Sequence, residues 1–400
     1  MIDAECIVVG AGPVGMLAAL LCVQQGSSVL LLEQTAERHF QSRAIGITPP
    51  SLEILRSIGL AGQFIEQGVA VRVSKAFGDG MQLGIIDFSG LAGDFRFVLS
   101  LPQDRTEALL EGAVLKNPAI RFRRGHQVLE CSEDGDRVIV SGTSADSGTF
   151  RFSGRYLLAC DGGKSAIRDS LGIPFEGAPQ RYTFLMGDYE DTTGWGPQAR
   201  FFATGRGSVE SFPLPDNQRR YVIRTPYFIK EYSGDYLGSE LLKRAGVDVS
   251  GTGQLWESGF GVQSYVARDF CKGRVFLCGD AAHLMTPVGG QNMNIGFADA
   301  ELAAWLTRLL IEDKAPYRLC AGLYNKARKR AVRAAYRRSR ALMVLGTSGG
   351  SVWSFIRAVA AFIIMKTPLR QILVQTFSMQ TIPFRNLDNF RKRYERELNL

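Results

Sequence analysis

The chain opens with an alternation of short apolar runs and helical apolar spacing. Residues 5–9 (ECIVV) predict a strand, residues 13–25 an amphipathic helix, and residues 29–33 (VLLLE) a second strand that ends in an acid. Strands that alternate with helices favour a parallel sheet, because the helix carries the chain back to the same edge. The pattern therefore predicts a βαβ opening of an α/β fold.

The middle of the chain is rich in strand patterns. Residues 69–99 alternate in polarity and contain many glycines, and residues 181–264 are again strand-rich. Between residues 120 and 158, four strand-like runs are separated by turn signals such as Asp134-Gly135. We expect these four runs to form an antiparallel meander.

Helices are expected on both sides of this region. Residues 51–67 and 104–115 have amphipathic spacing, a further helix is expected from about 295 to 312, and the chain is helical from 317 onward. A buried strand at 274–278 (RVFLC) precedes the helix at 295. The order predicts that the C-terminal third returns to the sheet before it ends in helices.

Composition narrows the class of protein. The net charge of +8 is modest, and its excess gathers in residues 326–340, which hold eight cations and no acid. A basic, solvated helix explains this run better than a nucleic-acid partner, because no recognition module is visible. The seven cysteines form no CxxC pair and the three histidines are scattered, so neither a disulfide framework nor a metal site is expected. No signal peptide is expected at residues 1–9, which favours a cytoplasmic protein.

A glycine-rich turn follows the first predicted strand. In Gly10-Ala-Gly12-Pro13-Val-Gly15, the first two glycines allow a tight turn and close approach to a pyrophosphate, and Gly15 allows the helix to pack on the strand. The helix N-terminus faces the negative charge. Glu33 ends the second strand, where its carboxylate can accept hydrogen bonds from ribose hydroxyls and repel a 2′-phosphate. The pattern favours FAD or NAD over NADP.

Two further motifs lie far along the chain. A predicted strand ends in Asp161-Gly162, and the strand at 274–278 ends in Gly279-Asp280. Asp280 is placed to hydrogen-bond a ribityl hydroxyl, and the loop after it presents backbone N–H groups at a helix start. Such groups stabilise a flavin ring that becomes anionic on reduction.

The order of these motifs resembles the class A flavoprotein monooxygenases, the para-hydroxybenzoate hydroxylase family, over residues 1 to about 340. The stretches that begin at Ser42 and at Gln103 are also similar to this family. The resemblance implies non-covalent FAD, with Arg43 and Gln103 at its pyrophosphate or ribityl chain. It also implies that Asp161 serves both FAD and pyridine-nucleotide binding.

The resemblance assigns the loop after Asp280 to the flavin. The residues implied at its reactive face or its pyrimidine edge are Pro287, Gly290, Asn292, Met293 and Asn294. The family usually has glycine where this chain has Asn292, and asparagine is the residue that best tolerates a positive φ after glycine. His283 is a candidate catalytic base, although a structural role near the flavin is the commoner use of such a histidine.

By this resemblance, NADH or NADPH reduces the flavin, and a flavin C4a-hydroperoxide transfers oxygen to substrate. The substrate expected is an apolar aromatic, polyketide-like or quinone-like molecule, hydroxylated or epoxidised with O2. Three alternatives stay open: a reductase of the geranylgeranyl-reductase type, a flavin-dependent halogenase, and a non-catalytic flavin-binding redox partner. Trp256 invites the halogenase reading, but the tryptophan motif typical of those enzymes is absent.

The expected architecture is a discontinuous FAD-binding domain interleaved with a mixed-sheet substrate domain, plus C-terminal helices. The boundaries expected are 1–75, 100–180 and 265–330 for the FAD-binding domain, 76–99 and 181–264 for the substrate domain, and 331–400 for the helical region. The apolar run 352–365 is too short to span a bilayer of about 30 Å. It favours a core-packing helix or a lid, with peripheral membrane contact as the alternative.

The strand pattern at 219–225 leaves two substrate classes open. Tyr221 and Ile223 share one face of this strand, and Arg220, Val222 and Arg224 share the other. An inward apolar face predicts a neutral ligand, and an inward basic face predicts an acid. We expect the apolar face to look inward.

Overall fold

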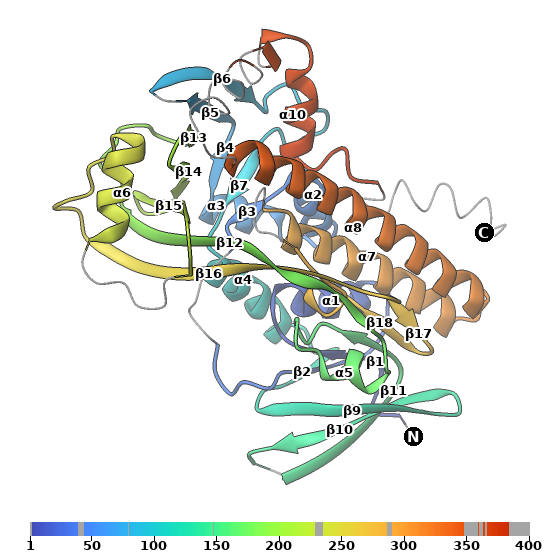
Figure 1. Cartoon of the computed structure of the whole chain (residues 1–400). Helices are drawn as coiled ribbons and strands as arrows, with labels where there is room; N and C mark the ends of the chain where they lie inside the picture. Colours follow the sequence, from blue (N-terminus) through green and yellow to red (C-terminus); the bar gives the residue numbers. More distant parts are fainter. Residues whose placement is uncertain are drawn as a thin grey trace.

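The computed structural model contains two large sheets, a small third sheet, and helices that cover them (Figure 1). The residues it describes are 2–38, 44–78, 80–146, 148–228, 235–285, 290–347, 359, 363–364 and 366–383. The mixed α/β class predicted from the sequence is confirmed.

The first sheet has eight strands and runs through the lower part of Figure 1. Its strands are β1 (Ala4–Val9), β2 (Val29–Leu32), β8 (Ile120–Arg123), β9 (His126–Asp134), β10 (Arg137–Ser144), β11 (Gly148–Ala159), β17 (Cys271–Lys272) and β18 (Val275–Leu277). The order along its main path is β17-β18-β11-β1-β2-β8, and the steps from β18 to β8 are all parallel. Strands β1, β2 and β18 are near-continuous apolar runs, as expected for parallel strands buried on both faces.

Strand β11 belongs to two kinds of pairing. Its first half pairs antiparallel with β10, which pairs with β9, and its second half lies parallel between β1 and β18. The predicted meander is therefore β9-β10-β11. The expectation that the run at 120–123 belongs to it was wrong, because β8 pairs in parallel with β2 at the edge of the core sheet. A short turn at Arg124 and Gly125 joins β8 to β9, but these two strands do not pair with each other.

The second sheet is mixed and lies in the upper part of Figure 1. Its strands are β5 (Val73–Gly78), β6 (Met81–Asp87), β12 (Phe175–Glu190), β13 (Gln198–Thr204), β14 (Gly207–Leu214), β15 (Gln218–Thr225), β16 (Gln254–Ala267) and β19 (His283–Leu284). The order is β19-β16-β12-β15-β14-β13-β5-β6. Within the described part of this sheet, the pairing of β13 with β5 is parallel and the other pairings are antiparallel. The small third sheet is β3 (Gly46–Ile47), β7 (Val98–Ser100) and β4 (Val69–Val71).

The helices pack mainly around the parallel sheet. They are α1 (Pro13–Gln24), α2 (Pro49–Ser57), α3 (Ala61–Gln67), α4 (Gln103–Leu115), α5 (Ala166–Ser170), α6 (Tyr236–Ala245), η1 (Gly279–Ala281), α7 (Gln291–Ile311), α8 (Tyr317–Thr347) and α10 (Arg370–Phe377). Helix α1 packs against α4 and α7, and α7 packs against α8, so one apolar core joins the N-terminal and C-terminal parts. A second core lies between the mixed sheet and α6.

Two helix predictions differ from the structure at their ends. The single helix expected at 51–67 is two helices, α2 and α3, because the chain turns at Gly59 with a φ of 77°. Helix α7 begins at Gln291, four residues earlier than expected, after Gly290 with a φ of 62°. The start of α7 therefore lies directly at the loop that follows Asp280.

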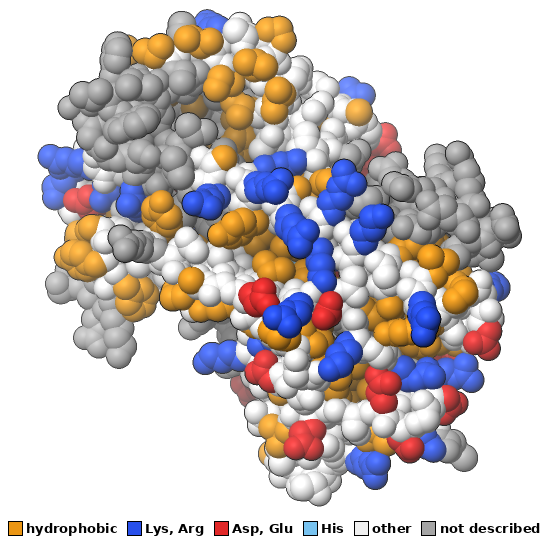
Figure 2. Space-filling model, turned by 45° about the vertical axis from the view of Figure 1, so that its right-hand side comes forward, with side chains coloured by type: hydrophobic (Ala, Val, Ile, Leu, Met, Phe, Trp, Pro, Cys, Tyr) orange, Lys and Arg blue, Asp and Glu red, His pale blue; other side chains and the backbone are white. Residues whose placement is uncertain are grey.

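Helix α8 carries the basic run and exposes most of it. Lys326, Arg330, Arg333, Arg337 and Arg340 are exposed, at spacings of three and four residues that place them along one side of the helix. Figure 2, which brings the α8 side of the molecule forward, shows Lys and Arg side chains gathered across the middle of this face. Among the described residues, none of the helices combines the length and apolar character needed to cross a bilayer.

Candidate functional site

The turn between β1 and α1 leaves an open cradle beside the sheet. A Cβ at Gly10 would lie 2.3 Å from the Cys160 carbonyl oxygen, and one at Gly15 would lie 1.8 Å from the Gly10 oxygen. By contrast, a Cβ at Gly12 would meet nothing within 4 Å, because Gly12 faces the cavity described below. With Pro13 as the first helical residue, the free N–H groups of the first turn remain available to an anion. This cradle fits the pyrophosphate of a dinucleotide.

Glu33 follows β2 and fixes the two loops beside the cradle. One carboxylate oxygen accepts a hydrogen bond from the Ala11 N–H at 2.7 Å, and the other accepts one from the Thr35 N–H at 2.9 Å. The oxygen bonded to the Thr35 N–H also accepts the Thr35 hydroxyl at 2.9 Å, so the oxygen bonded to Ala11 is the one that keeps capacity for a further donor. The position therefore fits the ribose contact expected from the sequence.

Asp161 follows β11, as expected, and is held by the short helix after it. Its Oδ2 accepts a hydrogen bond from the Ile167 N–H at 3.2 Å, whereas its buried Oδ1 has no hydrogen-bond partner in the described part of the chain. Burial raises the pKa of this carboxyl. Arg168 links the two distant motifs, because its guanidinium donates to the carbonyl oxygens of Gly163 and Ala281.

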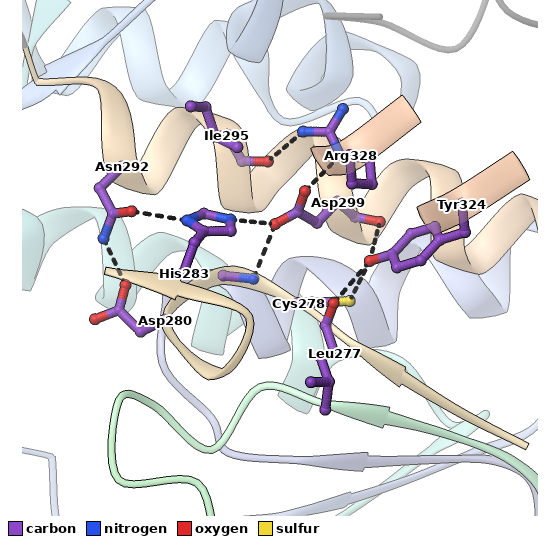
Figure 3. Close-up of polar contacts among 10 residues, drawn as sticks. Leu277, Cys278, Asp280, His283, Asn292, Ile295, Asp299, Tyr324 and Arg328 are labelled. Carbon is purple, nitrogen blue, oxygen red and sulfur yellow. Dashed lines mark hydrogen bonds and ion pairs between the residues drawn. The ribbon is translucent and has the colours of Figure 1, made fainter. Parts of the chain in front are cut away.

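Asp280 is the exposed end of a polar network, drawn in Figure 3, that runs from the cavity into the core. The Asn292 amide donates to Asp280 Oδ1 at 2.6 Å, and the Asn292 oxygen lies 3.0 Å from His283 Nδ1. His283 Nε2 lies 2.7 Å from Asp299 Oδ2. The Arg328 guanidinium donates to the other oxygen of Asp299. These five residues are called the polar network below.

The inner end of the polar network carries charge without contact with solvent. His283 and Asp299 have no exposed surface, and Arg328 has 1%. Burial raises the pKa of the Asp299 carboxyl, but Arg328 and His283 outweigh it, and the pKa is held below its ordinary value. Asp299 Oδ2 also accepts the Gly279 N–H at 3.0 Å, so the buried carboxylate fixes the backbone of the Gly279-Asp280 motif.

This arrangement favours a positioning role for His283 over proton exchange with a substrate. Both ring nitrogens face a side chain of the polar network, and the residue is absent from the cavity lining. Asn292 lies in the first turn of α7, and the positive φ falls at Gly290 instead. The sequence argument about a positive φ therefore does not apply to Asn292, whose side chain links Asp280 to His283.

The start of α7 brings together most of the loop residues expected at the flavin. Gly290, Asn292 and Met293 line the cavity. Asn294 is committed to the protein, because its amide donates to the Gly46 and Gly290 carbonyls and its oxygen accepts two bonds from Thr48. Asn294 therefore links α7 to the segment that precedes α2.

Gln291 was not predicted, yet it is the residue of this loop that lacks partners. It is 1% exposed and lines the cavity, and neither its amide nitrogen nor its oxygen has a hydrogen-bond partner in the described part of the chain. Buried polar atoms are normally satisfied. Both Gln291 atoms fit the donors and acceptors along the edge of a flavin ring.

Gln103 lies at the start of α4 and in the cavity lining. Its oxygen accepts the Ala44 N–H at 3.2 Å, and its amide donates to Glu107 at 2.9 Å. Arg43 and Pro287, which were also predicted at the flavin, lie outside the described residues.

One cavity of about 810 Å³ joins the cradle, the Gly279-Asp280 motif and the mixed sheet. On the sheet side it has an apolar wall, formed by Phe184, Met186, Phe201, Phe212, Val222 and Phe260. The cavity is large enough for a flavin and a ring-shaped ligand on the scale of known ligand sites.

The face of β15 that looks into the cavity is the one the sequence argument disfavoured. Arg220 and Val222 line the cavity, whereas Tyr221 and Ile223 pack in the core under α6. This orientation does not predict an acidic substrate, because Arg220 is already paired with Asp188 through hydrogen bonds of 2.6 and 2.7 Å. The expected orientation was wrong because both faces of this strand are buried, one by α6 and one by the cavity wall.

Asp299 and Arg328 were also missed by the sequence argument, which placed Arg328 in a solvated basic helix. A signal was present: Tyr324 and Val332, one turn before and after Arg328, share its side of the helix and are apolar. A lone arginine on the buried side of an amphipathic helix indicates a buried acidic partner.

The chain is similar to known FAD-dependent proteins. A family model described as an FAD binding domain matches residues 3–339. Rifampicin monooxygenase of Streptomyces venezuelae is 33% identical over 328 residues, covering 78% of this chain and 65% of that protein. Anhydrotetracycline monooxygenase of Streptomyces rimosus is 32% identical over 359 residues, covering 85% of this chain and 69% of that protein. The chain thus spans about two thirds of the length of these relatives.

Solved structures give the same result. The anhydrotetracycline hydroxylase from Streptomyces rimosus superposes with a TM-score of 0.78 at 29% identity, covering 95% of this chain and 76% of that one. The p-nitrophenol 4-monooxygenase from Pseudomonas putida has a TM-score of 0.85 at 20% identity, covering 94% and 98%, and shares the fold. The resemblance stated from the sequence is confirmed: the chain belongs to the FAD-binding family of the class A flavoprotein monooxygenases.

Proposed function

We propose that this protein is an FAD-dependent monooxygenase that uses NADH or NADPH and O2 to hydroxylate or epoxidise an apolar ring system. The observation that carries the proposal is the single cavity in which the glycine cradle, the Gly279-Asp280 motif and the apolar wall meet. A dinucleotide cradle alone would fit many flavoproteins. Its opening onto an apolar, ring-sized space supports a reaction on an apolar molecule.

The proposed cofactor site combines the residues expected from the sequence, of which Arg43 lies outside the described residues, with one residue that the structure adds. They are Gly10, Gly12, Pro13, Gly15, Glu33, Arg43, Gln103, Asp161, Gly279, Asp280, Asn292, Met293 and Asn294, with Gln291 added. When bound, FAD supplies the redox chemistry, as electron acceptor from the nicotinamide and electron donor to dioxygen. The protein binds and orients it, and the α7 N-terminus stabilises negative charge on the ring.

At the reacting end, the proposed task of the chain is to hold the substrate and exclude water. Gly290 and Pro287 are the residues proposed nearest the reactive face of the flavin, and the apolar wall holds the substrate ring. His283 is proposed to act through Asn292 and Asp280 rather than on the substrate. We further propose the domain boundaries expected from the sequence, with the parallel sheet in the FAD-binding unit and most of the mixed sheet in the substrate unit.

The names of the relatives support a polycyclic or aromatic substrate. The names of the two Streptomyces relatives contain rifampicin and anhydrotetracycline. The name of a relative from Sphingobium chlorophenolicum, which is 27% identical, contains pentachlorophenol. For this chain we propose the shared class, an aromatic, polyketide-like or quinone-like molecule. The reductase, halogenase and non-catalytic alternatives receive no comparable support from these names.

The test begins with the purified protein, which is expected to be yellow and to release FAD on heating. NAD(P)H oxidation should be stimulated by a ring-shaped substrate, and the product should carry one atom of 18O from 18O2. A product formed without O2 would indicate the reductase alternative, and a halide-dependent product the halogenase. A protein that takes up no FAD would overturn the proposal.

We also propose a cytoplasmic location. The apolar run 352–365, which was expected to form a core helix, a lid or a membrane contact, lies mostly outside the described residues. Its basic neighbour α8 would favour anionic lipid if this run reaches a surface. Sedimentation of the full chain with anionic liposomes is expected to leave the protein in the supernatant, and pelleting would support the peripheral contact.

A further inference from the structure

Glu210 lies on β14 and faces the cavity. In the pairing of β14 with its neighbours, it stands opposite Phe201 of β13 and Val222 of β15. Glu210 lines the cavity with Phe201 and Val222, and Phe212 follows it on the same face of β14. An acidic side chain therefore interrupts the apolar wall.

Glu210 differs from the other charged groups of the cavity because it has no partner. Asp280 accepts from Asn292, and Arg220 is paired with Asp188. No hydrogen bond or ion pair to the Glu210 carboxyl occurs within the described part of the chain. Burial alone raises the pKa of Glu210 to about 7.

A second unpartnered polar group lies in the same lining. Ser74 of β5 is 4% exposed, and its hydroxyl has no hydrogen-bond partner among the described residues. Its pairing partner in β13 is Ala199, which also lines the cavity, so the Ser74 side chain is on the cavity side of the sheet. On the mixed-sheet side of this lining, Glu210 and Ser74 are thus left for a ligand.

Leaving such groups unpaired is costly, because a buried polar group loses its water without compensation. A ligand that donates a hydrogen bond relieves this cost at Glu210, and a ligand with only apolar atoms there does not. A carboxylate at the same end would place two acids together, which disfavours its charged form. The chemistry of the wall therefore selects a donor on an otherwise apolar ring.

We infer that Glu210 is a specificity-determining residue that accepts a hydrogen bond from a hydroxyl group on the substrate ring, assisted by Ser74. The site then favours hydroxylated rings and disfavours rings with a carboxylate at this end. This inference rests on the proposed function, because it assigns the apolar side of the cavity to the substrate.

The test uses three probes with the same ring: 2-naphthol, 2-methoxynaphthalene and 2-naphthoate. Their binding to the oxidised holoprotein is titrated at pH 8, where the Glu210 carboxyl is ionised, with the flavin absorbance and fluorescence as signals. The variants are Glu210→Gln, Ser74→Ala and a matched control, Glu257→Gln. Burial also raises the pKa of Glu257, which lies in β16 of the same sheet but outside the cavity lining.

The native protein is expected to bind 2-naphthol about ten-fold or more tightly than 2-methoxynaphthalene, because the hydrogen bond is made to a charged acceptor. Glu210→Gln should weaken 2-naphthol by about ten-fold, leave 2-methoxynaphthalene within about two-fold, and strengthen 2-naphthoate. Ser74→Ala should weaken 2-naphthol by about two- to ten-fold. Glu257→Gln should change none of the three.

Three results would overturn the inference: an unchanged ratio between the first two probes in Glu210→Gln, tighter native binding of 2-naphthoate than of 2-naphthol, or no native binding of 2-naphthol. If Glu210→Gln does not fold, an unchanged 2-naphthol affinity in Ser74→Ala overturns it as well. FAD content and O2-dependent NAD(P)H oxidation are measured separately. A native protein that passes those two tests and fails the probe test therefore retains the proposed function and loses this inference.

Discussion

The polar network and the two mixed-sheet residues Glu210 and Ser74 differ in whether they have partners within the protein. On the α7 side, each member of the polar network has a protein partner, from exposed Asp280 to buried Arg328. On the mixed-sheet side, Glu210 and Ser74 face the cavity without one in the described part of the chain. The difference separates groups that hold the site in shape from groups that are left to recognise a ligand.

This difference predicts whether a substitution lowers stability and cofactor affinity or lowers ligand recognition alone. Removing a partnered group leaves its partner buried and unsatisfied, so stability or cofactor affinity is lost. Removing an unpartnered group takes away a cost of folding, so stability is kept while recognition is lost. Four substitutions test this contrast, in decreasing order of expected effect.

The largest effect is expected for Asp299→Ala. It removes the carboxylate partner of the Arg328 guanidinium in the core and the acceptor of the Gly279 N–H, so the free energy of unfolding should fall by about 3–5 kcal/mol. Urea unfolding followed by circular dichroism measures it. Glu312→Ala, which breaks a surface ion pair at the end of the same helix, is the control and should have a much smaller effect. Equal losses in the two variants would show that the polar network is not a special contributor to stability.

Asp280→Ala is expected to weaken FAD binding by about ten- to a hundred-fold. In the proposed site, the lost bond joins a charged acceptor to a ribityl hydroxyl, and such a bond is worth about 1.5–3 kcal/mol. Flavin fluorescence titration of the apoprotein measures the change. Asp269→Ala removes another acid of this region, one that pairs with Lys329 at the surface, and should leave the affinity unchanged. Unchanged affinity in Asp280→Ala would mean that the carboxylate does not reach the cofactor.

Asn292→Gly tests the link inside the polar network. Loss of its amide removes one hydrogen bond that orients the Asp280 side chain, so FAD affinity should fall by about two- to ten-fold, less than for Asp280→Ala. Asn292→Ala should show the same loss of affinity but a more stable α7, because glycine costs about 1 kcal/mol in a helix. If either variant binds FAD as tightly as the native protein, Asn292 contributes nothing to the placement of Asp280.

The smallest net effect, and the one of opposite sign, is expected for the stability of Glu210→Gln, because the amide that replaces the carboxyl is also a polar group without a partner. The pKa of Glu210 is raised from 4.5 to about 7, so the native protein loses stability as pH rises through this window. Below it, both folded and unfolded forms are protonated and the penalty vanishes. The variant should therefore match the native melting temperature near pH 4.5 and exceed it at pH 8. A lower melting temperature at pH 8 would assign Glu210 a structural partner.

The predictions from sequence succeeded where the signal is local. The strand, the glycine turn and the acid at Glu33 lie within thirty residues, and the spacing alone fixes which element each belongs to. The Asp161 and Asp280 motifs each end an apolar strand of the parallel sheet, and the carboxyl ends of such strands meet at one edge. Their convergence follows from the fold class.

The sequence could not predict features that depend on contacts between segments distant in the chain. Residues 120–123 resemble a meander strand, but their neighbour is β2, almost a hundred residues earlier. Alternation in β15 defines two faces, yet which face meets the cavity depends on where α6 packs. Asp299 and Arg328 lie on different helices, so their pairing depends on the contact of α7 with α8.

The path of the chain through the parallel sheet has a consequence for synthesis on the ribosome. Strands β11, β1, β2 and β8 are complete once residue 159 has emerged, but β18 joins β11 only after residue 277. The Asp299 carboxylate that fixes the Gly279 backbone receives its cation later still, from Arg328. A nascent chain that stops before α8 therefore leaves the buried Asp299 carboxylate without the Arg328 guanidinium. The polar network is complete only after this helix has been translated.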